Sequence, residues 1–347
     1  MSRDTKPLYS KSQVNRAGKN VREGSYSEED INIIENWRAS HNHILNSWQS
    51  TLRNRIKSKK VFFAQRLKRR ITIFDKVQRE PSMALANMHD IAGCRLIFQN
   101  IKDLQQYRTT LHDTKRFKHK LYKANEDPYN YIKNPAKSGY RGVHDVYIYK
   151  AQHTGGEPWD GLKVEIQFRT IHQHAWATAV EIAGALTGDY SKFDKGSEDQ
   201  KEFFRLASEI ISRAYEDKKS CYPKMSNKEL VLNFKKIEKK IHLLTRLSAL
   251  TKISVSFPVF KKKALILSAD YTDIDNPKVN ITPFSSLPEA TSKYFELEKS
   301  SSDKQDIVLV KAKDQDNIRN AYKNYFSDTE DFVAFVRKGI SILSKRK

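Results

Sequence analysis

Residues 162–170 read LKVEIQFRT, a run in which apolar and polar side chains alternate strictly from Leu162 to Arg169. This alternation is typical of a β-strand with one face in the core and the other toward solvent. Glu165, Gln167 and Arg169 would then share one face of the strand, as in the floor of an active site. An edge strand with one solvent-exposed face gives the same pattern, so the sequence alone leaves both interpretations open.

The segments around this strand show alternating and helical patterns in turn. Strands are predicted at 94–98 and 144–150, and helices at 101–115, 170–187 and 197–215. Ser27, followed by three acidic residues, predicts the start of a long amphipathic helix that continues to Ile56. We therefore expect an α+β fold in which a mixed β-sheet is flanked by helices.

The charge of the chain narrows the classes of partner. The 347 residues include 63 Lys and Arg against 41 Asp and Glu, which gives a formal net charge of +22. A chain this basic attracts polyanions such as nucleic acids and nucleotides.

Several other classes are excluded by the composition. The chain contains no run of about 18 apolar residues that could span a membrane, and residues 1–24 lack the apolar stretch of a secretory signal. Cys94 and Cys221 stand alone, without a CxxC motif or paired histidines, so we expect neither a disulfide framework nor a zinc site. The expectation is a cytoplasmic protein without a membrane partner, with a monomer favoured.

Four regions can be distinguished along the chain. Residues 1–24 are expected to be a flexible basic N-terminus, 25–222 a first domain, 223–251 a Lys-rich helical connector, and 252–347 a small α+β module. In that module, strands are predicted at 253–257, 264–268 and 307–310, and helices at 315–323 and from Ser327 onward.

Three motifs carry residues suited to phosphates, metals and bases. The run RLKRR at 66–70, with Lys76 and Arg79, offers guanidinium and ammonium donors to phosphate. The segment DIAGCR at 90–95 places an acid directly before a strand, as expected of a metal ligand beside a nucleotide. The segment KSGYRGVH at 137–144 holds Tyr140 between glycines, where it can stack on a base.

Each motif also has a purely structural interpretation. A basic run is usually a solvated face, DIAGCR can be a simple helix-to-strand turn, and Tyr140 can be a core residue next to a hairpin.

In combination, the motifs resemble the synthetase domain of the RelA/SpoT family. The resemblance spans roughly residues 45–215 and includes Arg66-x-Lys68, DIAGCR, KSGYRGVH and EIQFRT, in that order, followed by Trp176. Members of this family transfer the β,γ-pyrophosphate of ATP to a ribose 3′-hydroxyl, usually that of GDP or GTP. The resemblance therefore implies a pyrophosphokinase with ATP and Mg²⁺ as cofactors.

The resemblance also implies a role for individual residues. Asp90, Glu165 and Gln167 would be catalytic; Asp90 would bind Mg²⁺, and Glu165 would be either a second metal ligand or the base for the acceptor hydroxyl. ATP would be bound by Arg66, Lys68, Arg69, Thr72, Lys76, Arg79 and Arg95, with Arg66 and Arg95 on either side of the adenine. The acceptor would contact Lys137, Tyr140, Arg141, His144 and Arg169, with Tyr140 stacked on its base.

The rest of the chain favours one subgroup of the family. No hydrolase-type metal cluster precedes residue 60, so we do not expect one of the long bifunctional members. The segment after residue 222 resembles that of the toxic small alarmone synthetases of the CapRel type, which are fused toxin–antitoxin proteins. In that group the acceptor is the 3′ end of tRNA, translation stops, and a C-terminal module restrains the enzyme until it senses a phage capsid protein. Tyr322 and Tyr325 would be regulatory residues that compete with ATP; the alternative is a pair of core tyrosines.

The excess of cations supports tRNA as the partner. The residues assigned to a tRNA-binding patch are Arg53, Arg55, Lys57, Lys59, Lys60, Lys235, Lys236, Lys239 and Lys240. A mononucleotide needs fewer cations than this, whereas tRNA offers many phosphates. The alternatives are lysines that only solvate helices, a synthetase acting on GDP or GTP, and a non-catalytic RNA-binding sensor.

Overall fold

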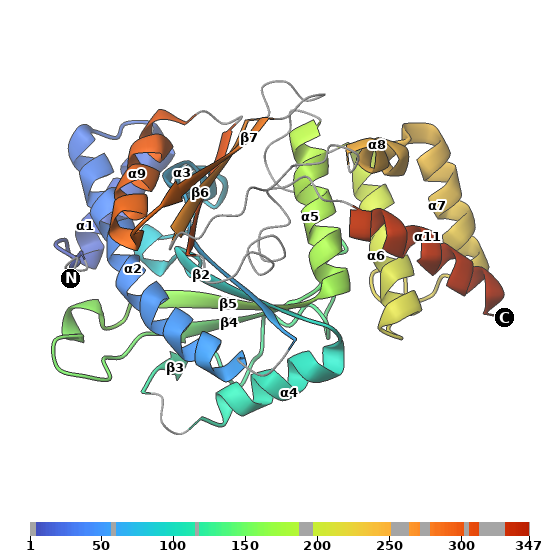
Figure 1. Cartoon of the computed structure of the whole chain (residues 1–347), viewed down its shortest axis with the longest axis horizontal. Coiled ribbons are helices and arrows are strands. Elements are labelled where there is room, and N and C mark those ends of the chain that lie inside the picture. Colours follow the sequence, from blue (N-terminus) through green and yellow to red (C-terminus); the bar gives the residue numbers. More distant parts are fainter. Residues whose placement is uncertain are drawn as a thin grey trace. The chain divides into compact units, whose positions relative to one another are not determined.

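The structure is a computed structural model that describes residues 5–56, 60–114, 118–186, 197–250, 264–270, 278–301, 305–311 and 330–346. The chain forms two compact units (Figure 1). The first comprises residues 1–96, 105–129 and 144–168, and the second comprises residues 97–104, 130–143 and 169–347.

A five-stranded sheet is the framework of the first unit, which holds all of it but the last residues of β2 and β5 and the first residue of β4. The strands are β1 (Phe62–Leu67), β2 (Ala92–Phe98), β3 (Lys120–Leu121), β4 (Val143–Ile148) and β5 (Lys163–Thr170), in the order β1-β2-β5-β4-β3. The strands predicted at 94–98, 144–150 and 162–168 are confirmed as β2, β4 and β5, and the α+β fold with a helix-flanked sheet is confirmed as well. Strands β1 and β3 were not predicted.

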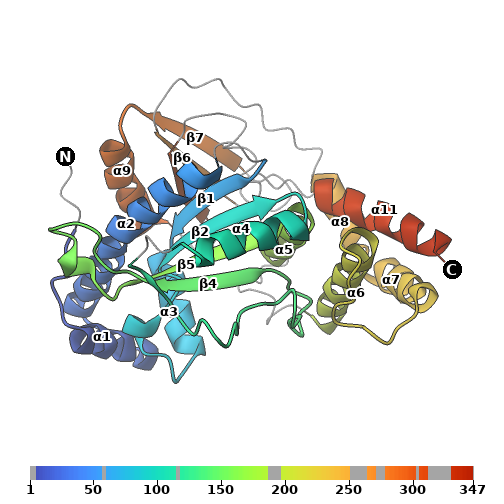
Figure 2. The ribbon, with the colours of Figure 1, turned by 90° about the horizontal axis from the view of Figure 1, so that it is seen from below.

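Two helices, α2 (Glu28–Ile56) and α4 (Ile101–His112), cover one face of this sheet (Figure 2). The Trp48 ring of α2 lies 4.6 Å from Tyr147 of β4, and Tyr107 of α4 lies 6.3 Å from Phe168 of β5. Because side chains alternate along a strand, Glu165 points to the opposite face.

The N-terminal segment differs from the expected flexible lead-in. Helix α1 (Lys11–Glu23) begins with a capping box at Ser10 and packs on α2 and on α3 (Arg70–Arg79). Its buried side is a narrow stripe at helical spacing, formed by Val14, Ala17, Gly18 and Val21. Gly18 lies so close to Leu85, in the short 3₁₀ turn Leu85–Asn87, that an added Cβ would be 2.7 Å from Leu85 Cβ. Residues 11–23 are therefore an ordered part of the first unit.

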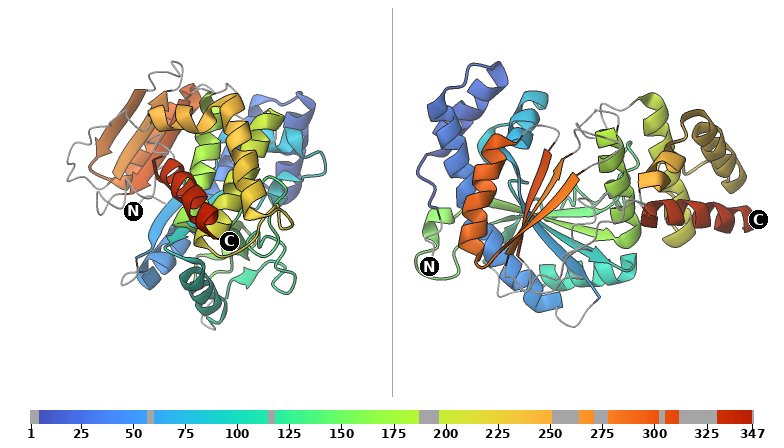
Figure 3. Two further views of the ribbon diagram at one scale, coloured as in Figure 1. Left: turned by 90° about the vertical axis from the view of Figure 1, so that its right-hand side faces the viewer. Right: turned by 45° about the horizontal axis from the view of Figure 1, so that its top comes forward.

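The second unit contains a group of five helices that share a core (Figure 3). They are α5 (Ile171–Leu186), α6 (Glu198–Tyr215), α7 (Asn227–Ile241), α8 (Leu243–Leu250) and α11 (Glu330–Lys345). The core includes Trp176, Phe203, Phe204, Ile210, Phe234, Leu247, Phe332 and Val336. The helices predicted at 170–187 and 197–215 are confirmed, and the expected connector at 223–251 is helical. Both α7 and α8 are built into this core, together with the last helix α11, rather than bridging separate bodies.

A second, smaller core belongs to an antiparallel sheet in residues 264–311. It consists of β6 (Ala264–Asp270), β7 (Lys278–Phe284), α9 (Leu287–Ser300) and β8 (Gln305–Lys311), with strand order β7-β6-β8. Ile266, Phe284, Ala290 and Tyr294 are buried between the sheet and the helix. The strands predicted at 264–268 and 307–310 are confirmed, whereas β7 and α9 were not predicted.

Some expectations for the C-terminal region concern residues outside the described ranges. These are the strand at 253–257, the helix at 315–323, the helix start at Ser327, and both Tyr322 and Tyr325. Among the described helices, none is long and apolar enough to cross a membrane.

Candidate active site

An aspartate paired with two lysines lies beside the polar face of the five-stranded sheet, just before one of its strands. Asp90 directly precedes β2, and its Oδ2 lies 2.7 Å from Lys68 Nζ, while its Oδ1 lies 3.1 Å from Lys76 Nζ. Lys68 follows β1 and is fully buried, whereas the Asp90 side chain keeps 19% of its surface exposed. The structure therefore differs from the expected phosphate contact at Lys68, since this side chain is covered and its ammonium group faces Asp90.

Glu165 of β5 is the second carboxylate on this face. His144 Nδ1 lies 3.3 Å from Glu165 Oε2, and Gln167 Nε2 donates to Glu165 Oε1 at 2.6 Å. Arg95 Nε in turn donates to Gln167 Oε1 at 3.4 Å. The predicted residues of β2, β4 and β5 are thus brought into one connected group.

The electrostatics of this group keep Glu165 ionised. Burial by itself would raise the pKa of Glu165, and the nearby charge of Asp90 acts in the same direction. The charge of His144 and the hydrogen bonds from His144 and Gln167 outweigh both, and the pKa of Glu165 falls to about 2. Glu165 is consequently a stable anion and a weak base at neutral pH.

The remaining residues assigned to ATP lie on β1, on α3 and, for Arg69, at the N-cap of α3. Arg66 is exposed, and strand alternation turns it away from Phe63, which lies under Arg53 of α2. Thr72, Lys76 and Arg79 follow one another at helical spacing on α3, so they share a side of that helix. Thr72 Oγ1 donates to the backbone carbonyl of Arg69 at 2.8 Å, and Arg79 Nε donates to Asp75 at 3.1 Å.

The two carboxylates fit Mg²⁺ by the chemistry of their oxygen donors. Among the described residues, no group of three or more His, Cys, Asp and Glu side chains is placed to hold a metal. Mg²⁺ does not need such a group, because one or two carboxylates with substrate phosphates and water are its usual ligands. Glu165 lies on β5, Asp90 directly precedes the neighbouring strand β2, and the charge of Asp90 acts to raise the pKa of Glu165.

Tyr140 and Arg169 form a second cluster, within the second unit. The Arg169 guanidinium lies over the Tyr140 ring, 5.2 Å from its centroid, and Arg169 Nε donates to Tyr140 Oη at 3.2 Å. Tyr131 meets Tyr140 edge-on at 5.4 Å, and Lys137 is exposed. Tyr140 is half-buried, as expected of a ring that stacks on a ligand or of one at the rim of a core.

Arg141 is not an accessible acceptor contact, contrary to the prediction. Only 3% of its side chain is exposed, and its Nη1 forms an ion pair with Glu216. The same carboxylate accepts hydrogen bonds from Thr170 Oγ1 at 2.7 Å and Gln173 Nε2 at 2.9 Å. Sequence reasoning missed Glu216 entirely, because it stands 75 residues from Arg141 and no motif includes it.

Comparison with known proteins identifies the family. Residues 65–184 match the region found in RelA / SpoT proteins. Over 160 residues the chain is 34% identical to the GTP pyrophosphokinase YjbM of Bacillus subtilis (strain 168). This alignment covers 45% of the chain and 69% of that relative. The chain belongs to the RelA/SpoT family.

Solved structures of related proteins have also been found. The small alarmone synthetase 1 from Bacillus subtilis is 26% identical, with a TM-score of 0.42 over 52% of this chain and 90% of that one. The same synthetase bound to its product pppGpp is 28% identical, with a TM-score of 0.42 over 50% of this chain and 88% of that one.

The RelA/SpoT match includes the carboxylates Asp90 and Glu165 and residues 137–144, the Tyr140 loop. It ends before Glu216. It also ends before α6, α7, α8, α9 and α11. These elements lie outside the matched region, so the match says nothing about their roles.

The residues of the expected tRNA-binding patch are distributed over α2, its C-terminal end and α7. Arg53 lies 5.0 Å from the Phe63 ring centroid and Arg55 is half-buried, so both are partly used in packing. Lys60 is exposed, whereas Lys57 and Lys59 lie outside the described residues. Lys235, Lys236, Lys239 and Lys240 of α7 are exposed, and Lys240 pairs with Asp199 at 2.7 Å.

Proposed function

We propose that the chain is an ATP-dependent pyrophosphokinase. The observation that carries this proposal is the group in which Asp90 faces two lysines and Glu165 faces His144 and Gln167. Phosphoryl and pyrophosphoryl transfer need alignment and charge compensation more than covalent help from the protein. This group offers two lysines at Asp90 and an ionised Glu165 on β5, the strand next to the one that Asp90 precedes.

The reaction joins the acceptor 3′-oxygen to the β-phosphorus of ATP. The bond between the α-phosphate and the β-phosphorus breaks, AMP leaves, and the hydroxyl proton is released. Asp90 and Glu165 would hold Mg²⁺, which when bound would offset the charge of the phosphates. Lys76 supplies a cation beside Asp90, and Arg95 lies at the other end of the hydrogen-bonded row with Gln167 and Glu165. Because the pKa of Glu165 is low, we favour this residue as a metal ligand over a general base.

For the acceptor we propose the 3′ end of tRNA. A net charge of +22 exceeds the need of a mononucleotide, and the four exposed lysines of α7 form a basic face suited to phosphates. Tyr140 would stack on the terminal base, beside Arg169. GDP or GTP is the second candidate, because the relative YjbM is named a GTP pyrophosphokinase.

The segment that follows the matched region would control the enzyme. We propose a fused toxin–antitoxin of the CapRel type, in which the module of residues 252–347 restrains synthesis, a phage capsid protein relieves the restraint, and tRNA modification stops translation. Tyr322 and Tyr325 would mediate the restraint. We also expect the protein to be a monomer in the cytoplasm.

The acceptor assay tests the activity directly. The protein is incubated with γ-labelled ATP, Mg²⁺ and, in parallel, deacylated tRNA, GDP or GTP. The proposal predicts label on the tRNA 3′ end, loss of that label in Asp90→Asn, and unchanged labelling in Asp113→Asn, a matched variant at an exposed aspartate. Label on GDP or GTP alone would establish the second candidate instead. Because the full-length chain is proposed to be restrained, Tyr325→Ala is assayed beside it, and no label on any acceptor with either protein would refute the pyrophosphokinase.

A further inference from the structure

Glu216, the residue that ends α6, connects three segments of the second unit. Its Oε2 pairs with Arg141 of the Tyr140 loop, and its Oε1 accepts from Thr170 at the end of β5 and from Gln173 in α5. The two ionic side chains are 3% and 2% exposed, so the pair is removed from water. A buried pair with additional hydrogen bonds fixes its members in one geometry.

The residues held by Glu216 are the chain neighbours of the stacked pair. Arg141 directly follows Tyr140, and Thr170 directly follows Arg169. Arg169 and Tyr140 contact each other through a cation–π contact and a hydrogen bond. Glu216 therefore holds the side chains of two residues that directly follow the surface on which the acceptor base would stack.

Among the described residues, Glu216 is the one carboxylate that pairs with Arg141. Arg141 Nε and Nη2 are buried without a hydrogen-bond acceptor there, so Glu216 is the carboxylate with which this guanidinium pairs. Loss of the Glu216 charge would leave a buried cation uncompensated. Arg141 would then move toward water and carry the neighbouring Tyr140 with it.

We propose that Glu216 is a positioning residue for the acceptor, which acts through Arg141 and Thr170 on the Tyr140–Arg169 pair. This inference rests on the proposed function, because it assumes that Tyr140 stacks on the acceptor base. Glu216, the C-cap of α6, lies outside the segment matched to the RelA/SpoT region, so that match assigns it no role.

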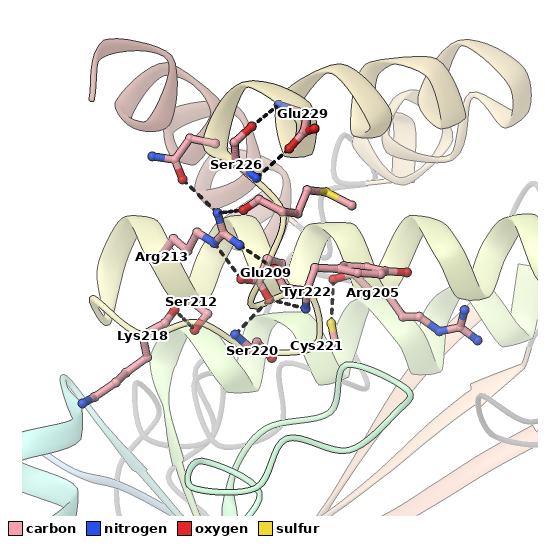
Figure 4. Close-up of polar contacts among 12 residues, drawn as sticks. Arg205, Glu209, Ser212, Arg213, Lys218, Ser220, Cys221, Tyr222, Ser226 and Glu229 are labelled. Carbon is pink, nitrogen blue, oxygen red and sulfur yellow. Dashed lines mark hydrogen bonds and ion pairs between the residues drawn. The ribbon is translucent and has the colours of Figure 1, made fainter. Parts of the chain in front are cut away.

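The chain offers a matched control on the same helix. Glu209 of α6 is also fully buried and pairs with an arginine, Arg213, at 2.6 Å (Figure 4). Its other oxygen accepts from the backbone N–H groups of Ser220 and Tyr222, at 2.8 and 2.9 Å. Glu209→Gln thus disturbs a buried ion pair of the same helix, but one that holds residues 220–222 instead of the Tyr140 loop.

The experiment compares Glu216→Gln with Glu209→Gln and the full-length wild type. The KM values for deacylated tRNA and for ATP, kcat, and the melting temperature are measured for each protein, and binding of a 5′-fluorescein-labelled RNA ending in CCA is measured by anisotropy. Glu216→Gln should raise the tRNA KM and the RNA Kd by about tenfold and leave the ATP KM within about twofold, because only the acceptor surface is displaced. Glu209→Gln should lower the melting temperature without this selective change.

Two results would overturn the inference: an unchanged RNA Kd in Glu216→Gln, or an equal rise in Glu209→Gln. Should Glu216→Gln fail to fold, Thr170→Val removes one hydrogen bond to the same carboxylate and is measured in its place, with a rise of about threefold expected. If both the wild type and Tyr325→Ala bind the RNA but transfer no pyrophosphate, the proposed function is refuted, while the Kd comparison would still decide the role of Glu216.

Discussion

Lys68 Nζ lies 2.7 Å from Asp90 Oδ2, and the lysine is completely covered while the aspartate remains in contact with the surface. The other oxygen of Asp90 lies 3.1 Å from Lys76, whose side chain is 18% exposed. Asp90 therefore links a buried cation to an accessible one. It compensates the charge of Lys68 and also belongs to the proposed magnesium site, and the two roles can be separated experimentally.

Asp90→Asn should reduce pyrophosphate transfer by about 100-fold, because a charged group aimed at the reacting phosphates is lost. It should also lower the free energy of unfolding by about 2 kcal/mol, since the buried Lys68 loses a counter-charge. The double variant Asp90→Asn/Lys68→Met should recover most of this stability in urea unfolding but none of the activity. A double variant as unstable as the single one would contradict the assignment of the destabilisation to Lys68.

The stability contributed by Glu165 should depend on pH below 4.5. Its pKa is lowered from 4.5 to about 2 in the folded protein, despite burial, by His144 and Gln167. A group with a depressed folded-state pKa stabilises the protein above its unfolded-state pKa, and this stabilisation disappears as the pH falls toward the folded value. The contribution, on the order of 2 kcal/mol, is therefore complete above about pH 4.5 and is lost between about pH 4.5 and 2.

Urea unfolding at a series of pH values tests this expectation. Glu165→Gln should flatten the pH dependence in that window. Glu23→Gln, which removes an exposed carboxylate 3.6 Å from Lys19, should leave the curve of the wild type unchanged. An identical pH dependence of stability in the wild type and Glu165→Gln would show that the pKa of Glu165 is not lowered in the folded protein.

Asp145, next to His144 on β4, should be a stability residue on the opposite face of the sheet. It is 2% exposed and accepts from Arg108 Nε and Nη2 at 3.0 and 2.6 Å, and His112 Nε2 lies 2.6 Å from its other oxygen. Asp145→Asn should cost about 3 kcal/mol, because Arg108 loses a buried counter-charge. Asp127→Asn removes the more exposed partner of Arg108 and should cost about 1 kcal/mol in the same urea experiment. The reverse ranking would contradict the burial argument.

The sequence predicts the central strands because their burial is periodic. In β5, Val164, Ile166 and Phe168 are fully buried and the residues between them are not, so alternation and structure coincide. Helix α1, by contrast, is not predicted, because its buried side has no clear pattern in the sequence. Its buried stripe consists of small residues in a basic and polar segment, and its partner Leu85 lies more than 60 positions away. Local pattern does not report a contact at that separation.

The residues of the candidate site show the same difference between what local sequence predicts and what distant contacts determine. Asp90, Glu165 and Gln167 are predicted from motifs, and the structure places all three on the polar face of one sheet. Arg141 belongs to an equally clear motif, yet it is buried against Glu216. A motif names the residue type, but the exposure of a long cationic side chain depends on a carboxylate contributed by a distant helix.

Gly139 should be the most sensitive residue of the Tyr140 loop. Its φ is +88°, and an added Cβ would lie 3.2 Å from both Arg205 Cα and Ser208 Cβ of α6. Its carbonyl accepts from Ser208 Oγ at 2.5 Å, so the backbone cannot move away without losing that bond. Gly139→Ala should lower the free energy of unfolding by about 3 kcal/mol, through backbone strain together with steric overlap.

Gly155 provides the control that separates these two terms. Its φ is +91°, but an added Cβ would meet nothing within 4 Å. Gly155→Ala should therefore cost only the strain, about 1 kcal/mol. Because the additional cost in Gly139→Ala arises from displacement of the Tyr140 loop from α6, this variant should also raise the KM for the acceptor, whereas Gly155→Ala should not. If chemical denaturation gave the same loss of unfolding free energy for both variants, the loop would be able to move at Gly139 without cost. Helix α6 would then not fix the position of Tyr140.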